Sequence, residues 1–128
     1  DETCIQGRAF LEAYTSAWGE PDPALSDVDA VALPIAVARA TRQSEISLPA
    51  TLNAYAIAML SNLVSAAIRL GAIGQFDGQR TLAALMPITR ELCRHARVAT
   101  RDSIGSVTFM ADLASLQHET QTTRLFRS

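Results

Sequence analysis

The sequence predicts an all-α fold, a helical bundle of about five helices that ends in a C-terminal tail. Apolar residues make up 48% of the chain but aromatic residues only 5%, so a core must be aliphatic and rich in alanine. That composition suits packed helices better than sheets, which favour aromatic and β-branched side chains. Apolar residues recur at helical spacing, and no run alternates as a strand does. With 128 residues, we expect one all-helical domain over residues 1–128.

The first helix is expected from the start of the chain to about residue 18. Its apolar face recurs at helical spacing and comprises Phe10, Leu11, Tyr14 and Trp18. Residues 19–23 end this helix, because they contain two prolines, which lack the amide donor that a continuing helix needs.

The second and third helices are also marked by proline and serine. A helix is expected over about residues 29–41, with Pro34 near its first turn, where a missing amide is tolerated. Its apolar face comprises Val31, Ile35 and Ala38. Ser47 is a natural N-cap for a long third helix, which we expect to end near residues 70–71.

Residues 46–68 form a run of 23 uncharged residues, which is long enough to span a bilayer. Polar side chains recur through this run at Ser47, Thr51, Asn53, Ser61, Asn62 and Ser65. Their burial in hydrocarbon would cost too much for so few leucines. We therefore interpret the run as the buried central helix of a bundle and expect no membrane association.

A fourth helix is expected over about residues 78–99, and Pro87 within it should kink the helix or leave a carbonyl unpaired. Its buried face should comprise Leu82, Leu85, Met86, Leu92 and Cys93. Ser106 can cap a fifth helix, whose apolar residues are Phe109, Leu113 and Leu116. The tail follows this helix.

Composition excludes several classes of function. All eleven Lys and Arg positions hold arginine, so neither a Walker A nucleotide site nor Schiff-base catalysis is possible in this chain. The net charge of −2 argues against a nucleic-acid partner. The acids concentrate in residues 1–30 and the arginines in residues 69–128, so the second half can present a basic face to an acidic partner. Cys4 and Cys93 belong to no paired motif, which indicates reduced thiols and a cytoplasmic protein.

The candidate metal ligands do not combine into a site. His118 and Glu119 resemble the start of a zinc-protease motif, but Thr122 stands where the second histidine is needed. Cys93 and His95 are two residues apart on a predicted helix, so their side chains point in different directions. We expect no catalytic residue, no metal site and no cofactor.

Residues 74–80 are rich in glycine and lead into a predicted helix, as a phosphate-binding loop does. Lysine is absent and Asp77 would repel an anion, which argues against that interpretation. Two interpretations stay open together. The segment is a helix–helix turn, in which glycines supply positive φ and Asp77 or Gln79 caps the next helix. It is also a suitable recognition loop, because polar side chains on a rigid turn make good partner contacts.

Four arginines are spaced to share one face of a helix, namely Arg90, Arg94, Arg97 and Arg101. A solvated face of an amphipathic helix explains this pattern. A basic docking strip for an acidic protein surface is the alternative.

Three blocks of the sequence resemble the urease accessory protein UreF family and occur in the family's order. They are Asn62-Leu63-Val64-Ser65-Ala66-Ala67-Ile68-Arg69-Leu70, Gly74-Gln75-Phe76-Asp77-Gly78-Gln79-Arg80, and His118-Glu119-Thr120-Gln121-x-x-Arg124-Leu125-Phe126-Arg127-Ser128. The resemblance covers residues 48–128 well and the first 45 residues loosely. It implies that the chain is the C-terminal part of a longer UreF-like protein.

The resemblance also implies a function. It implies a cytoplasmic, non-enzymatic chaperone of nickel urease that forms homodimers. Such a protein bridges a UreD/UreH-type accessory protein and a UreG-type GTPase, and the urease apoprotein is its indirect partner in nickel delivery. Residues 119–128 would form a partner-binding tail, and the matching positions are His118, Glu119, Arg124, Leu125, Phe126 and Arg127. A second partner surface would comprise Gln75, Asp77, Gln79 and Arg80.

Three other functions compete with this one. The chain is alternatively a helical protein-interaction domain unrelated to urease. A metal-dependent enzyme would use His95, His118 and nearby acids. A dimerisation domain of a transcription regulator is a further option, which the lack of a helix-turn-helix signature argues against.

Overall fold

The computed structural model describes residues 2–20, 22–25, 28–105, 110, 113–114 and 116–117. This part of the chain contains helices and no strand, so the all-α prediction is confirmed. The elements are α1 (Glu2–Trp18), η1 (Pro23–Leu25), α2 (Leu33–Gln43), α3 (Leu48–Arg69), α4 (Gln75–Ala96) and η2 (Arg101–Ser103). The predicted fifth helix falls largely outside the described residues, among which positions 110, 113–114 and 116–117 are helical.

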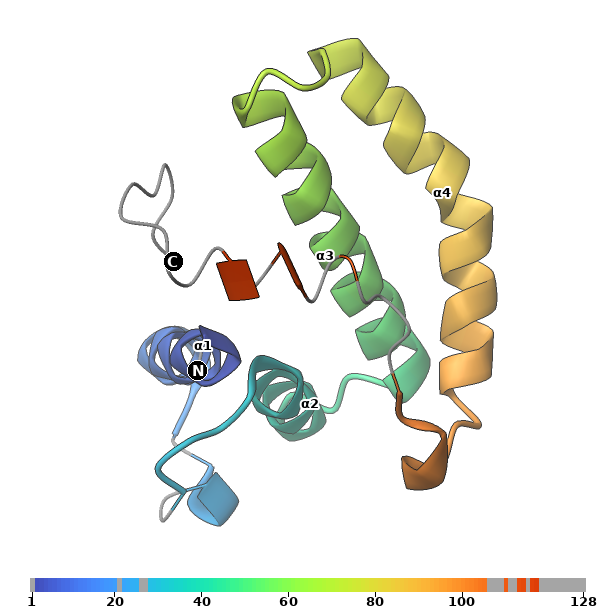
Figure 1. Ribbon diagram of the computed structural model, residues 1–128. Coiled ribbons are helices and arrows are strands. Elements are labelled where there is room, and N and C mark those ends of the chain that lie inside the picture. Colours follow the sequence, from blue (N-terminus) through green and yellow to red (C-terminus); the bar gives the residue numbers. More distant parts are fainter. Residues whose placement is uncertain are drawn as a thin grey trace.

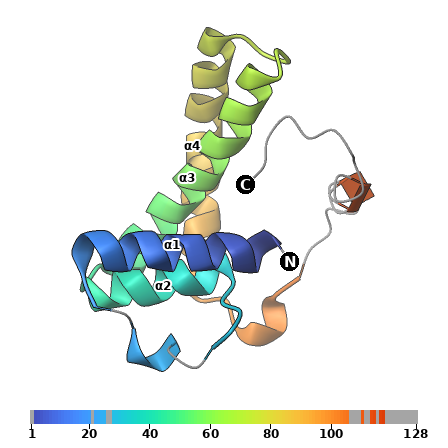
Figure 2. The ribbon, with the colours of Figure 1, turned by 90° about the vertical axis from the view of Figure 1, so that its left-hand side faces the viewer.

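The four α-helices pack as two pairs, α1 with α2 and α3 with α4. Helices α1 and α2 lie side by side and run in the same direction, because the connection between them returns along the pair (Figure 2). Helices α3 and α4 form an antiparallel hairpin that rises from the α1–α2 pair, with its turn at the far end (Figures 1 and 2). Each pair therefore presents its own packed seam.

The seam between α1 and α2 is built from small residues. Gly7 is the buried residue of α1, and a Cβ atom there would collide with the carbonyl oxygen of Val31. Ala36 and Ala40 of α2 are 0% and 2% exposed. Because none of these side chains is bulky, the backbones approach closely along the seam.

The predicted apolar faces of these two helices are partly wrong. Trp18 is 78% exposed, although its ring lies 6.3 Å from that of Tyr14. Ile35 is 53% exposed and Ala38 is exposed too. Val31 is buried as expected, but the buried positions of α2 are Ala36 and Ala40 instead of Ile35 and Ala38, because the small residues form the side that packs on α1.

An ion pair fixes the connection between α1 and α2. Asp22 accepts hydrogen bonds from Arg39 Nε at 2.5 Å and Nη2 at 2.7 Å, a bidentate arrangement. The Asp22 carboxylate also accepts from the amide of Ala24 at 2.9 Å, and its side chain is only 6% exposed. These hydrogen bonds, first those from Arg39, lower the pKa of Asp22 below its ordinary value of 3.8.

Helix α3 begins as predicted. Ser47 is the N-cap, and its side-chain oxygen accepts from the amide of Ala50 at 3.5 Å. Before it, Glu45 adopts a positive φ of 55°, which turns the chain out of α2.

The expectation that this third helix is the buried centre of a bundle is wrong within the described part of the chain. Only 6% of the most apolar window of α3 is buried, and Val64 is its one buried residue. By length and composition alone, α3 is also the one described helix that would be able to cross a membrane. The physical reason is that, among the described helices, α3 packs extensively only on α4, so the described residues leave one apolar face of α3 uncovered.

Helix α4 begins at Gln75, one turn earlier than expected, with Gly74 as its N-cap. No side chain caps it, so the predicted capping role of Asp77 or Gln79 is wrong. The helix continues through Pro87 to Ala96. The prediction that Leu92 is buried is also wrong, since this side chain is 62% exposed.

Replacing Gly7 with alanine should destabilise the protein. The added Cβ meets backbone atoms of residues 31–33, which cannot move aside as a flexible side chain can. We expect a loss of about 1–3 kcal/mol in the free energy of unfolding, measured by urea denaturation. Gly19→Ala is the matched control, because nothing lies within 4 Å of its Cβ position. Equal stability of the two variants would contradict this packing.

The Asp22–Arg39 ion pair predicts a pH dependence of stability. Because the folded pKa of Asp22 is lowered, its contribution is present at neutral pH and is lost as the pH falls below about 3.8. Asp22→Asn should therefore unfold at lower urea concentration than the wild type at pH 7, with the difference shrinking on acidification. Asp77→Asn, from an exposed pair with Arg80, should show little change at any pH.

Candidate functional site

The predicted partner surface in residues 75–80 lies at the tip of the α3–α4 hairpin. Gln75, Asp77, Gln79 and Arg80 all lie on the first two turns of α4, and all are exposed. The structure thus brings these four residues together. Figures 1 and 2 place the tip at the end of the hairpin that is remote from α1 and α2.

The two glutamines face a shallow depression on one side of the hairpin. Gln75 and Gln79 are one helical turn apart, and they line this depression together with Ser61 and Ser65 of α3. The amide and hydroxyl groups can donate and accept hydrogen bonds. This side of the tip can therefore bind a polar backbone or side chain.

The charged residues of the tip are paired with each other. Arg80 Nη1 donates to Asp77 Oδ1 at 3.4 Å, and both side chains are mostly exposed. An exposed pair of this kind contributes little to stability, so both groups can be redirected to a partner at small cost.

Phe76 is a functional candidate that the sequence reasoning missed. Its side chain is 83% exposed, and Leu70, just after the end of α3, is 58% exposed. Exposed aromatic rings surrounded by polar groups are frequent anchors of protein interfaces. The sequence did contain a signal for this residue, because Phe76 stands between Gln75 and Asp77 in the block that resembles the UreF family.

Close packing sets the position of the tip. Gly78 is buried in α4, and a Cβ atom there would lie 2.7 Å from Ile68 Cδ1 and 3.0 Å from Val64 Cγ1 of α3. The prediction that the glycines of residues 74–80 supply positive φ is wrong, because Gly74 has a φ of −79° and Gly78 lies inside α4. The positive φ of the turn is at Gly71, whose φ is 72°. Gly78 instead allows the two helices to approach each other.

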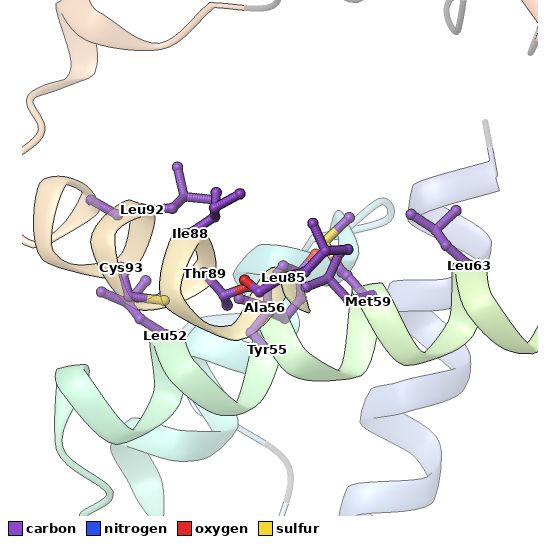
Figure 3. A pocket seen from close by; sticks show the side chains of 12 residues that line it. Leu52, Tyr55, Ala56, Met59, Leu63, Leu85, Ile88, Thr89, Leu92 and Cys93 are labelled. Carbon is purple, nitrogen blue, oxygen red and sulfur yellow. The ribbon is translucent and has the colours of Figure 1, made fainter. Parts of the chain in front are cut away.

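An apolar groove runs between α3 and α4 on another side of the hairpin. It has a volume of about 460 Å³. Its lining comprises Leu52, Tyr55, Ala56, Met59, Leu60, Leu63, Leu85, Ile88, Thr89, Leu92, Cys93 and Ala96. Figure 3 shows these side chains gathered from both helices around a common space.

The groove offers almost no polar group. The hydroxyl of Thr89, which is 4% exposed, donates to the carbonyl oxygen of Leu85 at 2.9 Å. By contrast, Met59, Leu63 and Ile88 are 51%, 66% and 65% exposed. Such a surface can bind an apolar partner.

The opposite face of α4 is basic. Arg90, Arg94 and Arg97 are exposed, as the predicted arginine strip requires. Arg101 lies in η2, beyond the end of α4, so the strip does not extend to it. Arg94 pairs with Glu91, which also contacts His95 Nε2 at 2.8 Å. The hairpin thus separates an apolar face from a charged one.

Within the described residues, no three His, Cys, Asp or Glu side chains gather closely enough to hold a metal ion. His95 is exposed and contacts only the acid of Glu91 among these groups. The predicted tail residues His118, Glu119, Arg124, Leu125, Phe126 and Arg127 lie outside the described residues.

The two cysteines should differ in reactivity towards a thiol reagent. Cys93 is 6% exposed between α3 and α4, whereas Cys4 is only partly buried on α1. We expect Cys4 to react first and Cys93 slowly, as followed by absorbance with an aromatic disulfide reagent. A Cys4→Ser variant should retain only the slow phase, and urea should abolish the difference. Rapid labelling of Cys93 in the folded protein would contradict its position.

Comparison with known proteins gives a consistent result. The family model for UreF matches residues 1–86, and this range includes the first 45 residues, where the motifs showed only a loose likeness. The chain is 50% identical over 129 residues to the urease accessory protein UreF of Bradyrhizobium sp. (strain BTAi1 / ATCC BAA-1182). That match covers 99% of this chain and 54% of the relative.

Other relatives have the same extent of match. The urease accessory protein UreF of Xanthobacter autotrophicus (strain ATCC BAA-1158 / Py2) is 48% identical over 130 residues, covering 99% of this chain and 54% of that protein. The protein of the same name from Rhodopseudomonas palustris (strain BisA53) is also 48% identical, with 55% of its length covered. The chain thus spans about half the length of the curated relatives it matches. No solved structure matches it.

Proposed function

This chain belongs to the UreF family, and on that premise we propose that it takes part in urease maturation as a non-enzymatic accessory protein. The observation that carries the proposal is the 50% identity, over 99% of the chain, to a urease accessory protein. The described surface supports a binding role. Its functional candidates are an exposed aromatic ring, amide side chains and an apolar groove.

The finer proposal concerns the partners. We propose that the protein bridges a UreD/UreH-type accessory protein and a UreG-type GTPase, so that nickel, the cargo, reaches the urease apoprotein. A bridge needs two separate contact surfaces. The tip of the α3–α4 hairpin and the tail of residues 119–128 are two such candidates, and the sequence separates them by about forty residues.

The tail is proposed to bind by coupled folding. Leu125 and Phe126 supply apolar area that is buried against the UreD/UreH-type partner. Arg124 and Arg127 flank this pair and bind carboxylates of the partner. His118 and Glu119 add polar contacts at the start of the tail.

The hairpin tip is proposed as the second surface. Phe76 supplies an aromatic anchor, and Gln75, Gln79 and the Asp77–Arg80 pair form a polar rim. We further propose that the protein works in the cytoplasm, in keeping with its two free cysteines. We also propose that it forms a homodimer, as the resemblance to the UreF family implies.

Co-expression tests the function as a whole. The chain is expressed with UreD/UreH-type and UreG-type accessory proteins and urease apoprotein, and we expect a complex to be recovered through a tag on this chain. The Bradyrhizobium relative serves as the positive control in the same assay. Recovery of a complex with the relative but not with this chain would contradict the proposal.

The tail contact is tested by a double substitution. Leu125→Ala with Phe126→Ala should weaken binding of the UreD/UreH-type protein by about tenfold or more, because two interface anchors are removed. Binding is measured by calorimetry, and helicity by circular dichroism should not change. Thr122→Ala with Thr123→Ala is the matched control within the same tail. If both variants bind as the wild type does, the tail is not the contact.

A further inference from the structure

The apolar groove between α3 and α4 has the dimensions of a helix-binding site. On α3 its lining extends from Leu52 to Leu63, and on α4 from Leu85 to Ala96. Each stretch is about three helical turns, or roughly 16 Å at 1.5 Å per residue. A third helix laid along two packed helices fills such a groove with its own apolar side chains.

A protein helix fits this surface better than a bilayer does. Over the length of the groove, α4 also carries Arg90, Glu91 and Arg94 on its other sides. A bilayer that covered α3 and α4 would have to enclose these charges. A helix seated in the groove covers only the apolar face and leaves the charges in water.

A second copy of the same face fits less well. The exposed side chains of the groove rim, such as Leu63 and Leu92, surround a hollow of about 460 Å³. Two hollows placed face to face cannot fill each other, and close packing requires a convex apolar ridge opposite. One amphipathic helix is such a ridge.

The family comparison points to the source of this helix. The chain spans about half the length of its relatives, with 54% of the Bradyrhizobium protein covered. The remaining length of the relatives is sufficient for several helices, and any amphipathic helix in it would have to bury its own apolar face. We infer that the α3–α4 groove is the seat of an amphipathic helix of about three turns from the part of the UreF fold that the match does not cover.

This inference rests on family membership and goes beyond the proposed function, because it assigns an internal docking site and needs no urease partner. It also gives the exposure of α3 a cause. Leu63 and Met59 of α3, and Ile88 and Leu92 of α4, are more than half exposed because the helix that would cover them belongs to the part of the family outside the match.

Co-expression with the part of a relative that lies outside the match tests the inference. The probe is a polypeptide spanning the part of the Bradyrhizobium UreF that the match does not cover. We expect it to co-purify one-to-one with this chain. Leu92→Glu should reduce recovery by about tenfold or more, because it places an unpaired carboxylate in an apolar contact. Val98→Glu is the matched control, since Val98 is 81% exposed and lies outside the groove.

A second measurement avoids any need for the separate polypeptide to fold. A photo-crosslinking phenylalanine derivative is placed in the intact Bradyrhizobium relative at the position aligned with Leu92. We expect the crosslinked peptide, identified by mass spectrometry, to come from the uncovered part of the same chain. A crosslink to the matched region or to a second copy would overturn the inference.

The remaining outcomes are equally decisive. Failure of both the co-purification and the crosslink would refute the docking site. So would a dimer of this chain that Leu92→Glu alone dissociates in sedimentation, or flotation with phosphatidylcholine vesicles that the same substitution abolishes. None of these assays contains a urease partner, so their failure leaves the bridging function standing. Conversely, loss of the bridging complex leaves the groove result unaffected.

Discussion

The structure depends on the close approach of helix backbones at two glycines. Gly7 lets α1 contact the start of α2, where any side chain would meet the Val31 carbonyl. Gly78 lets α4 approach α3 beside Val64 and Ile68. With few aromatic residues and many alanines, the protein cannot fill wide gaps between helices with bulky side chains. It closes the gaps by bringing the helices together instead.

Within the described part of the chain, packing of this kind leaves much of each helix exposed. A helix in a pair buries only one narrow face, and the buried residues here are mainly small ones such as Ala36 and Ala40. The larger side chains, among them Leu63, Ile88 and Leu92, therefore lie outside the seams. The same constraint that holds each pair together thus creates the apolar groove and makes it available for binding.

The α3–α4 hairpin combines three surfaces of different chemistry. The tip carries Phe76 with amides and an ion pair, one face carries the apolar groove, and the opposite face carries Arg90, Arg94 and Arg97. Surfaces of different chemistry on one rigid scaffold suit a protein that contacts several partners at once. These surfaces are the physical basis of the accessory role proposed above.

The sequence by itself determined the helical class, the N-cap at Ser47, the glycine turn after α3 and the membership of the UreF family. The helical class and the N-cap depend on local chemistry, such as capping and proline placement, which neighbouring residues reveal. Only the tertiary structure decided which faces are buried. Ile35 and Leu92 proved exposed, Gly78 proved to be a packing residue, and α3 was left half covered. The periodicity of a helix indicates that it has an apolar side, but the helix packed opposite determines how much of that side is hidden from water.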